Sequence, residues 1–184
     1  MLREFLTWLG QTPWSIALHE SLYVWPFAES LHVLTLALFA GTAAMLDLRL
    51  LGLALRGVPI TALTGRLLPW TRVAFGVMVV TGILLFYATP LTYYHSLFFR
   101  VKMLLLIVAS VNIFWFHSRT ERSIASWDSV DRPPRAPRVA ALVSLLAWSG
   151  VIVCGRLIAY NWFECDLQPQ PAWVNWAESC PERP

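Results

Sequence analysis

The chain has 184 residues, of which 57% are hydrophobic and 14% are charged, and its mean hydropathy is +0.57. Soluble domains usually carry about 25% charged residues, so this chain lacks the polar surface that a soluble globule needs. The same composition excludes a disordered chain, a coiled coil, collagen and a disulfide-dense secreted module. The net charge of +3 comes from scattered arginines, which argues against nucleic acid as a partner. A multi-span membrane protein remains.

The first 30 residues predict helices that lie at the membrane surface. Apolar residues recur there at helical spacing and form one oily face: Leu2, Phe5, Leu6 and Leu9. Pro13 and Pro26 bracket a second short segment. The polar residues and proline in this stretch break the unbroken apolar run of a signal peptide, so we expect the segment to be retained. A short re-entrant segment is the alternative.

Four later stretches are apolar enough to span a membrane, which takes roughly 20 residues. They cover residues 31–55, 68–88, 97–117 and 139–163. The Pro/Arg-rich stretch 132–138 breaks helical structure before the last span. The sequence therefore predicts an all-α integral membrane protein, with an interfacial segment (1–30), a four-helix transmembrane bundle (31–163) and a tail (164–184).

The arginines predict the orientation of this bundle. Most of them flank the first and third connections: Arg49, Arg56, Arg66, Arg72, Arg119, Arg122, Arg132, Arg135 and Arg138. By the positive-inside rule these two connections are cytoplasmic. Both termini are then periplasmic, in a bacterial inner membrane. A disulfide between Cys165 and Cys180 is expected in that oxidising compartment, with two unpaired thiols as the alternative.

Ionisable residues in the outer part of the spans are the strongest indication of function, because a charge in hydrocarbon is costly. His32 lies at the outer end of the first span, Arg100 and Lys102 in the outer part of the third, and Arg156 in the outer third of the fourth. His95 shares a face with Lys102 if the third helix already begins near residue 93. His19 belongs to the outer interfacial segment. Histidines and cations are thus predicted to converge on one side.

Histidines together with cations and few acids favour haem b as the ligand. Imidazoles bind its iron, and Arg or Lys neutralises its two propionates. A zinc or copper site would leave the cations without counter-charges. We expect iron ligands from His32 and from His95 or His19, with the propionates facing the cations. The alternative for each residue is an interfacial side chain that snorkels to the headgroups.

A second polar group lies toward the inner side and includes Asp47, Arg49, Arg72 and His117. Asp47 is predicted to form a structural ion pair that fixes helix packing, with Arg49 as its partner and Arg72 or His117 as the alternatives. A proton path or a second haem is the other interpretation. A second bis-histidine haem would lack a partner for His117, the one histidine at that depth.

Several stretches resemble an uncharacterised family of small bacterial four-span membrane proteins, a domain of unknown function. They are PWSIALHESLY (13–23), ESLHVLTLALFAGT (29–42), LDLRLLGLAL (46–55), PWTRVAFGVMVVTGILLFY (69–87) and FFRVKMLLLIVASVNIFWFH (98–117). The resemblance implies the four-span fold and carries no established activity. More distantly, the pattern is similar to membrane b-type cytochromes and copper-resistance membrane proteins. The chain departs from two-haem cytochromes because it lacks two histidines at each membrane depth.

The sequence thus predicts a b-type cytochrome that holds haem near the periplasmic face and exchanges electrons with quinone or a periplasmic carrier. It would be a homo-oligomer or a subunit of a membrane complex. A metal-handling protein or transporter that binds copper is one alternative. A cofactor-free accessory subunit of a larger membrane complex is the other. An electron-transfer protein is favoured over a stand-alone enzyme.

Overall fold

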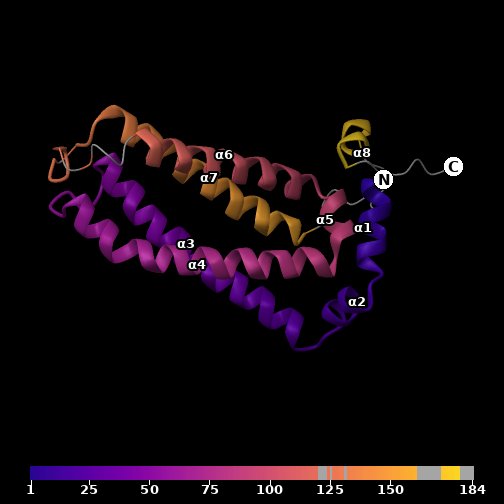
Figure 1. Cartoon of the computed structure of the whole chain (residues 1–184). Coiled ribbons are helices and arrows are strands. Elements are labelled where there is room, and N and C mark those ends of the chain that lie inside the picture. Colours follow the sequence, from indigo (N-terminus) through magenta and orange to yellow (C-terminus); the bar gives the residue numbers. More distant parts are fainter. Residues whose placement is uncertain (120–123, 125, 131, 161–170, 179–184) are drawn as a thin grey trace.

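The computed structural model describes the chain except for residues 120–123, 125, 131, 161–170 and 179–184. Four long helices run back and forth through the molecule (Figure 1): α3 (Val24–Leu51), α4 (Ile60–Ala88), α6 (Leu97–Arg119) and α7 (Arg135–Ile158). All four are long and apolar enough to cross a membrane. The predicted fold class, an all-α integral membrane protein with four spans, is confirmed.

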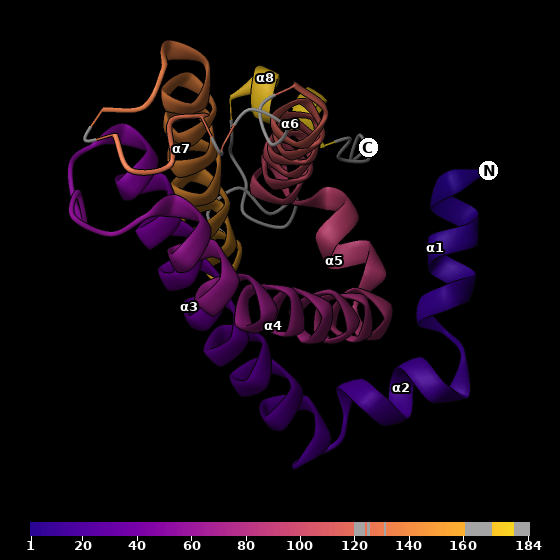
Figure 2. The ribbon, with the colours of Figure 1, turned by 60° about the vertical axis from the view of Figure 1, so that its left-hand side comes forward.

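The spans pack in the order α4, α3, α7, α6. Helix α3 lies against both α4 and α7, and α7 lies against α6. Figure 2 shows α4 and α6 at the two ends of this row, joined through the short helix α5 (Pro90–His95). Helices α4 and α6, both described throughout, are not packed against each other along their length. The bundle therefore has one open side.

An aromatic and small-residue core fills the centre of the bundle. The rings of Phe39 on α3 and Trp148 on α7 meet edge-on, with 4.4 Å between their centroids. Ala74 and Ala147 are almost fully buried beside them. Small residues at helix contacts bring backbones close, which is how spans associate where lipid removes the hydrophobic drive between them.

We call the end of the bundle that carries the α3–α4 and α6–α7 connections the loop end. A fully buried arginine, Arg49, joins the two connections there. Its guanidinium donates to the carbonyl of Val58 at 2.7 Å, and to the carbonyls of Asp128 and Val130 at 3.3–3.4 Å. Arg49 therefore satisfies carbonyls from both connections and holds the two connections together at the end of α3.

Asp128 caps the first turn of α4 from the other connection. Its carboxylate accepts the Thr61 backbone N–H at 2.8 Å and the Thr61 hydroxyl at 2.6 Å. These donors lower the pKa of the Asp128 carboxyl below its ordinary value. The arrangement satisfies N–H groups that a helix start would otherwise leave unpaired.

The opposite end, which we call the terminal end, carries α1 (Leu2–Gly10), α2 (Pro13–His19), α5 and α8 (Ala172–Glu178). Helix α1 lies against α5, and α2 lies against the end of α4 (Figure 1). The buried hydroxyl of Ser15 donates to the carbonyls of Tyr87 and Ala88. The apolar face of α1 is largely exposed, with Phe5 and Trp8 more than half accessible. Its exposure is consistent with the predicted interfacial segment.

Three of the four spans differ in length from the prediction. Helix α3 begins seven residues before the predicted start, because Pro26 falls in its first turn, where no intrahelical donor is needed. Gly52 then ends α3 with a left-handed φ of 70°. Helix α4 begins at Ile60, before the predicted start at residue 68, and contains Pro69. Helix α7 covers Arg135–Ile158, earlier at both ends than predicted. The third span, α6, starts as predicted.

Candidate functional site

His32 is the one histidine placed among the four spans in the terminal half. Its Nδ1 lies 2.9 Å from the hydroxyl oxygen of Thr81 on α4. The single proton of that hydroxyl is directed to the carbonyl of Val77 at 2.8 Å, so the hydroxyl accepts from the imidazole. Nδ1 therefore carries the proton of the neutral ring, which leaves the Nε2 lone pair available as a ligand.

A glycine lets this ring lie against α4. A Cβ atom added at Gly82 would stand 3.2 Å from Cε1 of His32, closer than ordinary van der Waals contact. Gly82 follows Thr81 directly, so one residue holds the imidazole and the next makes room for it. Gly76, on the same helix, has open space where a Cβ would stand.

Lys102 on α6 reaches toward the same region from the other side. Its Nζ lies 3.7 Å from the position that a Cβ of Gly155 on α7 would occupy, and its charge acts on the His32 ring. Among the described residues, no carboxylate lies within 4 Å of this ammonium. We call His32, Thr81, Lys102 and Gly155 the His32–Lys102 cluster; it draws one residue from each span.

The other predicted cations do not join this cluster. Arg156 is exposed on α7, where its guanidinium donates to the Tyr160 hydroxyl at 3.0 Å and lies 4.8 Å from the centre of that ring. Its position on α7 turns it away from His32, and its expected role beside a propionate stays a prediction. Arg100 donates to the carbonyls of Tyr94 on α5 and Ala177 on α8, so it connects helices at the terminal end.

His19 and His95 also lie outside the spans. His19 is exposed at the end of α2, with its ring 5.6 Å from that of Trp25. His95 ends α5, with its ring 5.1 Å from that of Tyr94. Ser96 is extended, with φ −82° and ψ 116°, and separates α5 from α6. The condition for aligning His95 with Lys102, one helix from residue 93 onward, is therefore not met.

The terminal end of the open side is closed by aromatic rings. Phe86 on α4 and Phe99 on α6 stack with centroids 5.6 Å apart, and Tyr93 packs against both. Burial, together with the charge of Glu29, raises the pKa of the Tyr93 hydroxyl.

Asp47 and Arg49 do not form the predicted ion pair. Their side chains lie about 200° apart around α3, since each residue turns a helix by about 100°. Arg49 is used by loop carbonyls, whereas Asp47 accepts a hydrogen bond from the hydroxyl of Ser144 on α7. No ion pair within 4 Å connects them in the described chain.

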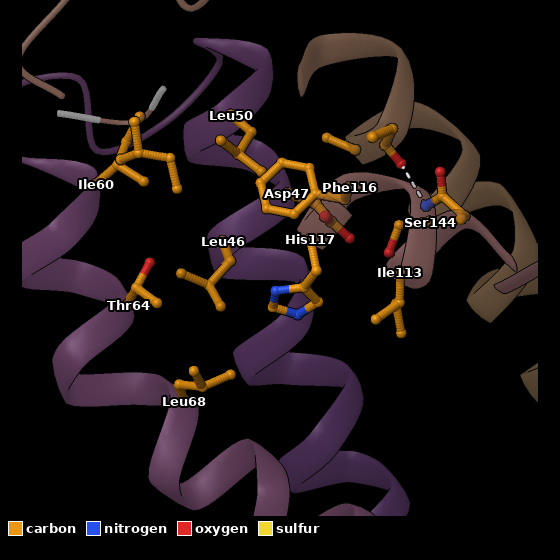
Figure 3. A pocket seen from close by; sticks show the side chains of 14 residues that line it. Leu46, Asp47, Leu50, Ile60, Thr64, Leu68, Ile113, Phe116, His117 and Ser144 are labelled. Carbon is orange, nitrogen blue, oxygen red and sulfur yellow. Dashed lines mark hydrogen bonds between the residues drawn. The ribbon is translucent and has the colours of Figure 1, made fainter. Parts of the chain in front are cut away.

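Asp47 instead faces a pocket at the loop end (Figure 3). The pocket has a volume of about 160 Å³ and is lined by residues of all four spans. His117 on α6 points into it, and Asn112 anchors its wall by donating to the Ala140 carbonyl at 2.9 Å. Asn112 and Ser144 were not predicted as site residues, although an uncharged polar residue inside a span can indicate a polar contact between helices.

The described residues contain no group of three or more His, Cys, Asp or Glu side chains that would hold a metal ion. The predicted iron ligands, His32 with His95 or His19, stay a prediction. Cys165 and Cys180, the predicted disulfide, lie outside the described residues. Cys154 is a buried free thiol on α7.

The fold, the His32–Lys102 cluster and the Asp47 pocket define a four-span, helical membrane protein with ionisable side chains toward both ends of its bundle. The chain belongs to DUF6644, a family of unknown function, whose model matches residues 4–161. The predicted membership of an uncharacterised family is confirmed. No curated protein and no solved structure matches the chain.

Proposed function

We propose that this protein is a membrane-embedded b-type cytochrome that binds one haem b in the terminal half, with Nε2 of His32 as the histidine ligand of the iron. The observation that carries the proposal is the hydrogen bond between Nδ1 of His32 and the hydroxyl of Thr81. A histidine that ligates a metal usually donates its other ring N–H to a neighbouring oxygen, as His32 does to Thr81. The residues present fit a haem with one histidine ligand.

Lys102 supports the same ligand through its charge. An ammonium between spans, with no carboxylate within 4 Å among the described residues, is costly to leave without an anion. A haem propionate would supply that anion. A bare metal cation would be repelled by it, so Lys102 favours haem over copper.

The roles of the chain's own groups follow from their positions. Thr81 orients the His32 ring, Gly82 makes room for it, and Lys102 would hold a propionate. The bound haem would supply one-electron transfer between its ferric and ferrous states. The bundle walls, including the Phe86–Phe99 stack, would keep water from it. Electrons would be exchanged with a quinone or a periplasmic carrier.

The proposal includes a location in a bacterial inner membrane, with the loop end cytoplasmic and the terminal end periplasmic. Exposed arginines gather at the loop end: Arg56, Arg66, Arg132, Arg135 and Arg138. Cytoplasmic connections carry such an excess of basic residues. A homo-oligomer or a place in a larger membrane complex would extend the electron path beyond one subunit.

Absorption spectroscopy of the purified protein tests the haem. We expect a Soret band, a reduced α band and a positive pyridine haemochrome assay. His32→Ala should lose the bands, whereas the exposed His19→Ala should keep them. Lys102→Met should bind haem more weakly, because a propionate would lose its counter-charge, and Lys102→Arg should restore part of the binding.

Three results would overturn this proposal. A colourless protein that carries copper would indicate a metal-handling protein or transporter. A colourless, metal-free protein that is expressed with its membrane partners would indicate an accessory subunit. Unchanged bands in His32→Ala would remove His32 from the iron.

A further inference from the structure

The pocket at the loop end combines an apolar wall with a buried carboxylate. Leu46, Ile60, Leu68 and Ile113 contribute the apolar surface (Figure 3). Asp47 is 8% exposed, and it faces the pocket from α3. His117 presents its imidazole to the same space from α6. Pockets of this kind, apolar with a few convergent polar groups, are typical of small-molecule sites.

The carboxylate keeps hydrogen-bonding capacity for a ligand. A carboxylate offers about four lone-pair sites, and the described partner of Asp47 is one hydroxyl, that of Ser144. Two nitrogen-bearing side chains, Arg49 two residues further along α3 and Asn112 in the pocket wall, are used elsewhere. Arg49 donates to loop carbonyls, and Asn112 donates to the carbonyl of Ala140.

The surroundings favour a neutral donor over a cation. The loop end is rich in exposed arginines, whose positive charge disfavours a cationic ligand that enters from the aqueous side. A neutral hydroxyl can donate to Asp47 without this cost. Because the rest of the wall is apolar, the ligand that bears this hydroxyl must otherwise be hydrophobic.

The volume of the pocket and the route into it further restrict the hydrophobic part of the ligand. Its volume of about 160 Å³ matches a single six-membered ring, since an apolar cavity of about 150 Å³ accepts benzene. Helices α4 and α6, which form two of its walls, are not packed together along their described length, so the pocket adjoins the open side of the bundle. A ring dissolved in the bilayer would enter there.

We propose that this pocket binds the ring of a membrane-dissolved hydroquinone, with one hydroxyl donating to Asp47 and His117 as a second hydrogen-bonding group. The site lies at the opposite end of the spans from His32 and does not depend on haem. The proposal concerns binding alone and includes no electron-transfer step.

Calorimetric titration of the protein in nanodiscs under argon tests the site, with empty nanodiscs as the background. Benzene-1,4-diol is the probe, and p-xylene is its analogue of similar shape without donors. We expect one diol per chain. Asp47→Leu should weaken diol binding at least tenfold, which is about 1.4 kcal/mol, and should leave p-xylene binding unchanged or stronger. Glu29→Gln, an exposed acid at the other end of α3, should bind the diol like the native chain.

A milder variant covers the case in which Asp47→Leu does not fold. Asp47→Asn replaces one acceptor oxygen by a donor of similar shape, and we expect at least threefold weaker diol binding. His32→Ala should bind the diol normally, so failure of this site and failure of the haem proposal are distinguishable. Equal binding of the diol to native and both Asp47 variants would overturn the inference. Tighter binding of benzylammonium than of the diol would also overturn it, in favour of a cation site.

Discussion

At the scale of single residues, three polar side chains in the interior of this bundle have a defined hydrogen-bond partner. Thr81 holds His32, Ser144 holds Asp47, and Arg49 is satisfied by carbonyls. Lys102 differs, because no carboxylate lies within 4 Å of it in the described chain. That contrast is why an anionic ligand is proposed beside Lys102 and nowhere else in the spans.

The close approach of the His32 ring to Gly82 predicts that a larger side chain at position 82 reduces haem binding. Gly82→Leu should displace the imidazole from α4, because even a Cβ at that position would stand 3.2 Å from Cε1. We expect the haem-to-protein ratio of the purified variant to fall severalfold. Gly76→Leu is the matched control on the same helix, where a side chain meets open space, and its ratio should stay native. Native haem content in both variants would contradict the placement of haem against Gly82.

At the scale of elements, the start of α4 depends on a residue far away in the sequence. Asp128 lies in the α6–α7 connection, and its carboxylate accepts two hydrogen bonds from Thr61. This cap therefore joins the start of α4 to the α6–α7 connection. Helices α4 and α6 are held together at the loop end in this way, although they are not packed against each other along their length.

This cap predicts an acid-dependent loss of stability. Because the folded pKa of Asp128 is lowered, its contribution is complete above the unfolded pKa of 3.8 and is lost as the pH falls through the lower folded value. Asp128→Asn should lower the thermal unfolding temperature at pH 7 and flatten its fall below about pH 4. Glu20→Gln, at an exposed acid of the terminal end, should leave both unchanged in detergent. An unchanged acid profile in Asp128→Asn would show that another carboxyl controls it.

At the scale of the whole molecule, the bundle is an open row of four spans rather than a closed ring. The terminal end of its open side is closed by the Phe86–Phe99 stack. The loop end of that side adjoins the Asp47 pocket. The two candidate sites thus lie at opposite depths, one behind an aromatic closure and one next to the lipid.

The orientation of the molecule can be tested by labelling single cysteines in a chain whose native cysteines are replaced by serine. Ser129→Cys, in the α6–α7 connection, should react only after an impermeant maleimide reaches the cytoplasm. Gln11→Cys, between α1 and α2, should react from the periplasm of intact cells, because both residues are exposed. Reversed labelling would invert the proposed orientation, and labelling of both from one side would contradict the four-span fold.

From the sequence alone the number of spans and the fold class could be predicted, because span length and apolar composition are local properties of a helix. The sequence also identified His32, Lys102, Asp47 and His117 as the residues to examine. The tertiary structure decided which of them meet. The extended Ser96 separates His95 from α6, and the rotation of α7 turns Arg156 outward. Partners such as Thr81 and Ser144 lie on other helices, and helix rotation and pairing depend on long-range packing that no single stretch of sequence contains.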